Sequence, residues 1–161
     1  MGESAKQVVE TGVDESGLGR WAWFKFAGSG PPPTRLIVAY CPCKAPEEKL
    51  LSPYMQQKPY FRLQGRMTCP RKLFVADLVT CVARWRTAGE RIKLCLDAND
   101  DVQSGMLANP FRQRHVDISE VSRRVHPTLP PFSTFGSGGR PGSRQIDGVF
   151  LFHDLRLDAL S

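Results

Sequence analysis

The residues best suited to chemistry follow a short apolar run near the middle of the sequence. The run from Ile92 to Leu96 is typical of a buried strand, and it leads directly into Asp97, Ala98 and Asn99. Because side chains alternate along an extended chain, Asp97 and Asn99 are expected to point the same way. A carboxylate and a carboxamide on one face can contact a phosphate, a divalent cation or an attacking water. A solvated turn explains the same residues equally well, since Asp and Asn dominate turns.

Two further residues interrupt or end apolar runs in a way that indicates a site. Asp147 lies inside the apolar stretch 146–152, where burying a carboxylate is costly unless it is paired or bound to a ligand. The alternative for Asp147 is an edge strand on which its side chain faces water. Tyr40 ends the apolar run 35–40. Its phenol could bind a phosphate oxygen, or it could cover the rim of the core and keep its hydroxyl in water.

The elements that must position these residues are mostly strands. Aromatic and β-branched residues predict strands over 20–26 and 35–40, which a turn rich in Gly and Pro joins into a hairpin. Further strands are expected over 92–96 and 146–152. With one long and one short helix between them, the order β-β-α-β-α-β predicts an α/β domain built on a mixed sheet.

Caps and breakers predict where the helices and loops lie. Apolar side chains at helical spacing predict a long helix that starts after a Thr68 cap, carries Pro70 in its first turn and stops at Gly89. A short helix capped by Asp117 is expected to end at Val125. The other segments are expected to be irregular: a flexible lead-in at 1–19 before a single domain at 20–161, and loops at 41–67, 102–111 and 128–144.

Three motifs in this order resemble the endonuclease/exonuclease/phosphatase family: Val38-Ala39-Tyr40-x-Pro42, Leu94-Cys95-Leu96-Asp97-Ala98-Asn99 and Gln145-Ile146-Asp147-Gly148-Val149-Phe150. A Ser133-Thr134-Phe135 stretch upstream of the last motif also fits. The family includes deoxyribonuclease I, apurinic/apyrimidinic endonucleases, retroelement endonucleases and inositol-phosphate phosphatases. The resemblance, which spans roughly residues 18–155, implies a four-layered α/β sandwich that cleaves phosphoester bonds with Mg2+.

The resemblance also implies a role for each matched residue. Asp97 would activate or orient the attacking water, and Asn99 would hold the scissile phosphate. Tyr40 would stabilise the charge that develops on that phosphate. Asp147 would orient the catalytic histidine of the family.

Other family residues have no counterpart in this sequence. The metal-binding Glu of the family is not found, because Glu10 and Glu15 lack an apolar strand context. The closing Asp-His pair is not matched either, since His153 precedes Asp154 in reversed order. The expectation is an incomplete domain, truncated at both ends, with its principal Mg2+ ligand unassigned. Such a chain would be a poor catalyst by itself, because losing members of a catalytic unit costs orders of magnitude in rate.

The charge balance favours a polyanionic partner. The net charge is +6 and the pI about 9.3. Arginines in the loops around the motifs are candidate nucleic-acid contacts, although a solvated surface explains them equally well. These arginines are Arg62, Arg66, Arg112, Arg114, Arg140 and Arg144. Two alternatives stay open: a catalytically dead module that binds nucleic acid or protein, and a phosphoesterase that acts on phospholipid or inositol phosphate head groups.

Several classes of protein are disfavoured by the composition. No apolar run approaches the roughly 20 residues of a membrane span, and no secretory signal is visible at the start. Five cysteines, an odd number, favour reduced thiols and an intracellular location, cytoplasmic or nuclear. The spacing of Cys41-Pro42-Cys43 has no matching second pair, so a structural zinc site is not expected.

Overall fold

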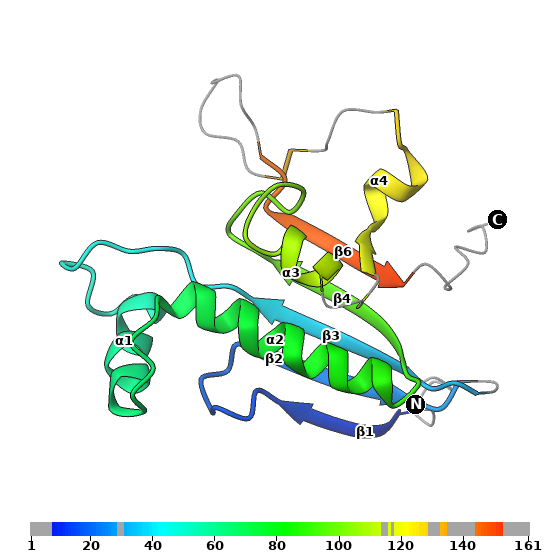
Figure 1. Cartoon of the computed structure of the whole chain (residues 1–161), viewed down its shortest axis with the longest axis horizontal. Helices are drawn as coiled ribbons and strands as arrows, with labels where there is room; N and C mark the ends of the chain where they lie inside the picture. Colours follow the sequence, from blue (N-terminus) through cyan, green and yellow to red (C-terminus); the bar gives the residue numbers. More distant parts are fainter. Residues whose placement is uncertain are drawn as a thin grey trace, which may run out of the picture.

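A six-stranded mixed sheet forms the centre of the computed structural model, which describes residues 8–28, 31–113, 116, 118–128, 133–134 and 144–152 (Figure 1). The strand order is β1-β2-β3-β4-β6-β5. The predicted α/β class with a mixed sheet is confirmed. The elements are β1 (Val8–Val13), β2 (Trp21–Phe26), β3 (Thr34–Tyr40), α1 (Pro53–Leu63), α2 (Pro70–Thr87), β4 (Arg91–Asp97), α3 (Ala108–Gln113), β5 (Ile118–Glu120), α4 (Val121–Val125) and β6 (Asp147–Phe152).

The strand directions change across the sheet. β2 and β3 form the predicted antiparallel hairpin, and β1 pairs with the outer edge of β2. β3 and β4 run parallel, so the chain must cross over between them, and α1 and α2 lie in that crossover. β6 pairs antiparallel with β4 and β5 antiparallel with β6. The carboxyl ends of β3 and β4 therefore lie beside the start of β6.

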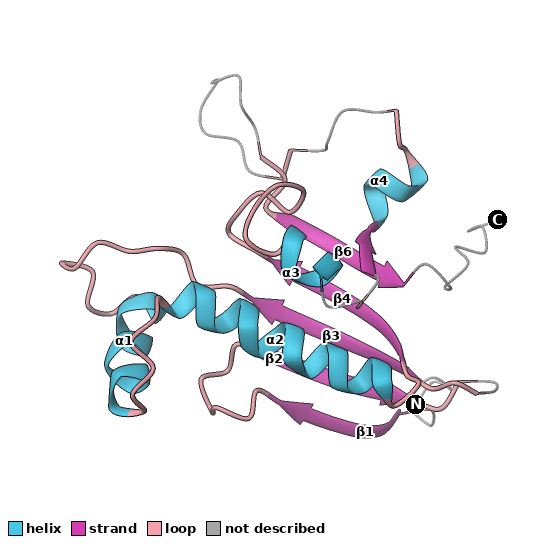
Figure 2. Ribbon diagram, viewed as in Figure 1, coloured by secondary structure: helices cyan, strands magenta, loops and turns pink. Residues whose placement is uncertain are grey.

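The main core lies between α2 and one face of the sheet (Figure 2). Phe74, Leu78 and Val82 on α2 are fully buried, and they belong to the same cluster as Ile37 and Leu94 on the sheet. The helix begins with Pro70, as predicted, but its N-cap residue is Cys69 rather than Thr68. Gly89 has a φ of 81°, a left-handed conformation that suits glycine, so the chain turns there as predicted.

The flexible lead-in predicted for 1–19 is wrong for Val8–Val13, which forms β1. This segment has a weak strand pattern, and its pairing with β2 supplies the order that its composition does not. Gly12 is required where β1 passes Trp23, because a Cβ at that position would lie 2.4 Å from the indole ring. Close packing at the edge of the sheet therefore orders a segment whose sequence is typical of a loop.

The loop predicted for 41–67 is also wrong, since it contains α1. Ser52 is the N-cap, and its hydroxyl accepts a 3.3 Å hydrogen bond from the Met55 N–H. Pro53 occupies the first turn, where its missing N–H costs nothing. Buried Tyr54, Gln57 and Phe61 share one side of the helix at helical spacing.

Two smaller expectations are corrected near the carboxyl end. The short helix predicted for 117–125 is a strand, β5, followed by the single turn α4, and its expected cap Asp117 lies outside the described residues. The loop predicted for 102–111 includes the start of α3. Within the described part of the chain, no helix is both long and apolar enough to cross a membrane.

Candidate functional site

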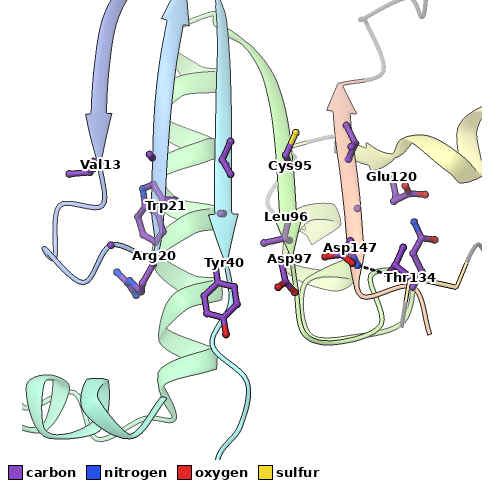
Figure 3. A pocket seen from close by; sticks show the side chains of 17 residues that line it. Val13, Arg20, Trp21, Tyr40, Cys95, Leu96, Asp97, Glu120, Thr134 and Asp147 are labelled. Atoms are coloured by element: carbon purple, nitrogen blue, oxygen red, sulfur yellow. Dashed lines mark hydrogen bonds between the residues drawn. The ribbon is translucent and has the colours of Figure 1, made fainter. Parts of the chain in front are cut away.

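Three predicted site residues lie in one row across the sheet, as Figure 3 shows. Tyr40 on β3 is the register partner of Asp97 on β4, and Asp97 is the partner of Asp147 on β6. Directly opposite residues on neighbouring strands have Cβ atoms about 4.5–5.5 Å apart. We call Tyr40, Asp97 and Asp147 the edge row, because it lies where β3 and β4 end and β6 begins.

The edge row borders a groove of about 820 Å³ on the face of the sheet opposite α2. The floor of this groove is apolar, with Val38, Cys95 and Val149 on three adjacent strands. Its wall includes Thr134 near the start of β6. The groove therefore offers acidic groups at one end and an apolar surface beside them.

Asp97 is a half-buried carboxylate with a raised pKa. The largest cause is desolvation, which disfavours the charged form, and the nearby negative charge of Asp147 acts in the same direction. The backbone N–H of Asn99 donates to Asp97 Oδ1 at 3.1 Å and opposes the shift without cancelling it. Asp97 is consequently more basic than an exposed aspartate.

Tyr40 presents a phenol at the rim of the groove, with 41% of the residue exposed. Its pKa is raised, first by desolvation and then by negative charge at Cys43 and Asp97. The phenol therefore keeps its proton at neutral pH. Its backbone N–H donates to the Arg20 carbonyl at 2.9 Å, which joins the end of β3 to the start of β2. Tyr40 can act as a hydrogen-bond donor to an anion in the groove.

Asp147 is exposed and is held in place through its backbone. Thr134 Oγ1 accepts hydrogen bonds from the N–H groups of Ile146 at 2.9 Å and Asp147 at 3.0 Å. One hydroxyl thus fixes the first residues of β6. The exposed side chain agrees with the alternative in which Asp147 faces water, although β6 is not an edge strand. The Ser133-Thr134 stretch singled out in the sequence therefore supports the edge row.

Asn99 is close to the edge row in sequence, but it does not line the groove. Its φ is 47°, a left-handed turn conformation that Asn tolerates. Its Nδ2 donates to the Cys41 carbonyl at 2.8 Å. This side chain ties the segment after β4 to the segment after β3, as the turn interpretation predicts.

Sequence reasoning missed three polar residues that line the groove, namely Arg20, Glu120 and Gln145. The Arg20 side chain is buried and pairs with Asp14 at 2.6 Å and Asp77 at 3.0 Å. Asp77 is far from Arg20 in the sequence and Asp14 is near it, but no motif indicated either pair. Glu120 bonds to the Ser122 hydroxyl, and Gln145 is buried. The Arg20–Asp77 pair arises from tertiary packing, whereas the Ser122–Glu120 contact is local.

The arginines that were predicted to contact nucleic acid lie in different environments. Arg66 pairs with Asp77 at 2.5 Å, which gives it a structural contact. Arg62 is exposed on the last turn of α1, and Arg144 is exposed three residues before Asp147. The side chain of Arg112 is not described, and Arg114 and Arg140 lie outside the described residues. Arg144 is thus the predicted contact that adjoins the edge row.

The two early glutamates lie away from the edge row. Glu10 pairs with Lys25 at 3.5 Å on the α2 side of the sheet, and Glu15 pairs with Arg84 of α2 at 2.7 Å. Among the residues with described positions, no three His, Cys, Asp or Glu side chains gather into a group that could hold a metal ion. The principal metal ligand therefore remains unassigned.

All five cysteines are free thiols in the structure. Cys41 is buried, and desolvation raises its pKa to about 12, so it behaves as a small apolar side chain. Cys43 is exposed. The two residues differ too much in environment to act as a pair.

The chain matches no protein-family model and no curated protein. The resemblance to the endonuclease/exonuclease/phosphatase family therefore depends on the three motifs alone. Their arrangement in the fold is the observation on which a function can be argued.

Proposed function

We propose that this chain is a phosphodiesterase-like domain of the endonuclease/exonuclease/phosphatase type that acts on nucleic acid. The observation that carries the proposal is the strand register, which sets Tyr40, Asp97 and Asp147 side by side. These residues come from three separate motifs. Motifs that matched by chance would have no reason to meet at one place. The proposal extends to the fold, in which this sheet and its helices correspond to one half of a four-layered sandwich.

The proposed chemistry assigns one role to each member of the edge row. Asp97 accepts a proton from the attacking water, a task for which its raised pKa suits it. Tyr40 donates its phenolic proton in a hydrogen bond to a phosphate oxygen as negative charge develops there. Asp147 lies opposite Asp97 and is positioned by Thr134. By resemblance Asp147 would orient a histidine, and no histidine of this chain is assigned that role.

Mg2+ is the cofactor that the resemblance implies, and the donor set of the edge row suits it. Mg2+ is commonly held by one or two carboxylates together with water and substrate phosphate oxygens. Asp97 and Asp147 offer two carboxylates on neighbouring strands, and a cation would relieve the repulsion between them. Asp147 would hold the ion beside Asp97, which stays free to accept a proton, and the ion would supply stabilisation of charge on the phosphate.

Nucleic acid is the proposed substrate because one exposed arginine lies next to the acidic row in the chain and a second lies on α1. Exposed Arg144 adjoins the start of β6, and exposed Arg62 lies on α1 in the crossover that follows β3. Arginine forms strong paired hydrogen bonds with phosphate oxygens. Such contacts would hold a phosphate backbone near the row without reading its sequence.

Cleavage of supercoiled plasmid DNA by the purified chain tests the proposal. Slow nicking is expected with Mg2+ and none with excess EDTA. Asp97→Asn should lower the nicking rate by about a hundredfold or more, which is the usual contribution of a general base. Glu48→Gln, at an exposed acidic position in the loop before α1, is the matched control and should nick like the wild type. Absence of Mg2+-dependent nicking, or equal loss in both variants, would refute this function.

Parallel assays distinguish the substrate classes. RNA, inositol phosphates and phospholipid vesicles replace the plasmid under the same conditions. Release of inorganic phosphate from inositol phosphates without nicking of DNA would transfer the proposal to head-group phosphatases.

Binding without cleavage is a second candidate function, and the position of Asn99 favours it. The Asn99 amide donates to a backbone carbonyl and does not line the groove, so this side chain does not hold a phosphate there. A binding module would show DNA affinity that falls steeply with salt. Asp97→Asn would leave this affinity intact, whereas Arg62→Gln together with Arg144→Gln would lower it. Fluorescence anisotropy with labelled DNA measures both effects.

A further inference from the structure

We propose that two copies of this chain associate through the open face of the sheet, the face opposite α2. One apolar row crosses this face on five neighbouring strands, and its members are paired in register from strand to strand. The row consists of Val13, Ala22, Val38, Cys95 and Val149. This association goes beyond the proposed function. It sets a second sheet against the open face and covers the edge row, so nucleic acid would bind the monomer and not the dimer.

The apolar row is exposed to a degree that favours a partner. Val13 is 64% exposed, Val38 53% and Val149 43%. Phe24, on the same face, is 41% exposed. A sheet with one solvated face normally turns polar side chains outward. A continuous apolar surface on central strands instead indicates a contact surface, because covering it removes that area from water.

The charges on this face indicate that a second copy is the partner. Lys93 and Asp97 lie on the same side of β4, and each is two residues from Cys95. A two-fold axis that runs along the apolar row past Cys95 reverses the strand direction of the second sheet. Lys93 of each copy then meets Asp97 of the other, with Asp147 beside that Asp97 on β6. The same contact then forms twice, as in any two-fold interface. A stack with the strands in the same direction would instead oppose like charges.

The strand spacing limits how tight this dimer can be. Strands lie about 4.8 Å apart, so five strands span only about 20 Å. The interface is therefore at the small end of specific interfaces. Its two charge pairs are at the rim and set the orientation more than the affinity. We expect a reversible dimer with a dissociation constant in the micromolar range.

Sedimentation velocity over a wide range of micromolar concentrations tests the association. The wild type should change from monomer to dimer as concentration rises. Lys93→Glu and Asp97→Lys should each weaken the dimer by about tenfold or more, because each opposes like charges twice. The double variant Lys93→Glu with Asp97→Lys should restore it. Lys72→Glu, an exposed reversal on α2, is the control and should dimerise like the wild type.

Restoration by the double variant separates a lost contact from a lost fold. A wild type that stays monomeric throughout, a dimer that ignores both single reversals, or a double variant that stays monomeric would each overturn the proposal. The readout is mass rather than cleavage, so its failure is distinct from failure of the phosphodiesterase function.

Crosslinking at Cys95 tests the position of the axis. Packed sheets lie about 10 Å apart, a gap that a short bismaleimide can bridge between the two Cys95 thiols. The test uses a Cys43→Ser background, because Cys43 is exposed and would react elsewhere. A covalent dimer is expected, and Cys95→Ser should abolish it. A covalent dimer that survives Cys95→Ser would place the contact on another surface.

Discussion

Charged side chains are arranged differently on the two faces of the sheet. On the α2 face, the Arg35 side chain is 3% exposed and donates to Glu90 at 2.6 and 2.9 Å. The same guanidinium lies over the rings of Trp23 and Trp85. On the open face, Asp97 lies opposite another aspartate, and the positive charge of nearby Arg71 does not outweigh the desolvation that raises the pKa of Asp97. The first arrangement pairs its buried charges, although Arg35 Nη1 has no hydrogen-bond partner, and the second leaves like charges together.

This difference separates residues that hold the fold from residues that are free to act. A buried charge without a partner is costly, so the α2 face can contain only paired groups. The edge row avoids that cost by remaining partly solvated. The repulsion between its two carboxylates adds nothing to the stability of the fold, as is usual at a functional site. Matched substitutions on the two faces can test the comparison.

The largest difference is expected for phenylalanine. Phe74→Ala should lower the free energy of unfolding by about 3–5 kcal/mol, because it empties a fully buried position under the sheet. Phe24→Ala on the open face should cost clearly less, since 41% of Phe24 is already exposed. Urea unfolding of both variants, at a concentration low enough to keep the chain monomeric, measures the two values. Equal losses would mean that the open face is as well packed as the core.

The next largest effect concerns the buried ion pair. Glu90→Gln should destabilise the fold by about 3 kcal/mol, because it leaves the Arg35 charge buried without its counterion. Glu10→Gln is the control, since Glu10 is half-exposed and lies 3.8 Å from the same arginine. It should change stability by less than about 1 kcal/mol. A Glu90 variant as stable as the Glu10 variant would contradict the contrast.

The pH dependence follows from the same pair. Desolvation raises the pKa of Glu90, but hydrogen bonds from Arg35 and Lys25 outweigh it and leave the pKa lowered. A carboxyl with a lower pKa in the folded state stabilises the fold above its unfolded pKa. That contribution is lost as pH falls through the folded pKa. The free energy of unfolding should therefore fall less steeply with decreasing pH for Glu90→Gln than for the wild type.

The sequence predicts the buried strands and the long helix, because their apolar runs and caps are local signals. It fails for β1 and α1, whose order comes from contacts with β2 and with the core. In α1 the spacing of Tyr54, Gln57 and Phe61 is helical, but Pro53 at the start of the helix and Pro59 inside it hide the pattern. Each member of the edge row could be singled out from the sequence. That the three members meet, and that Asn99 turns to a backbone carbonyl, follows only from strand register and turn geometry.

A smaller effect of opposite sign is expected at the edge row. The pKa of Asp97 is raised in the folded chain, first by desolvation. Its ionised form is therefore disfavoured by folding, and stability should rise as pH falls through the folded pKa. Asp97→Asn should stabilise the monomer at neutral pH by up to about 1 kcal/mol, and this gain should shrink in acid. Thermal unfolding at several pH values measures it. A destabilised Asp97→Asn monomer would show that the carboxylate holds the fold.

The smallest effect on stability is expected at an exposed position of the open face, where the side chain has few neighbours. Val38→Thr exchanges a methyl group for a hydroxyl at a residue that is 53% exposed, so the monomer should change in stability by less than about 0.5 kcal/mol. The same exchange at Val82, which is fully buried, places a hydroxyl among apolar side chains and should cost about 1–3 kcal/mol. Chemical denaturation of the pair compares one substitution in two environments. Val38 is exposed in the monomer and covered in the proposed dimer. Val38→Thr should therefore weaken association and leave the stability of the monomer unchanged. That result would show that Val38 contributes to the dimer contact rather than to folding.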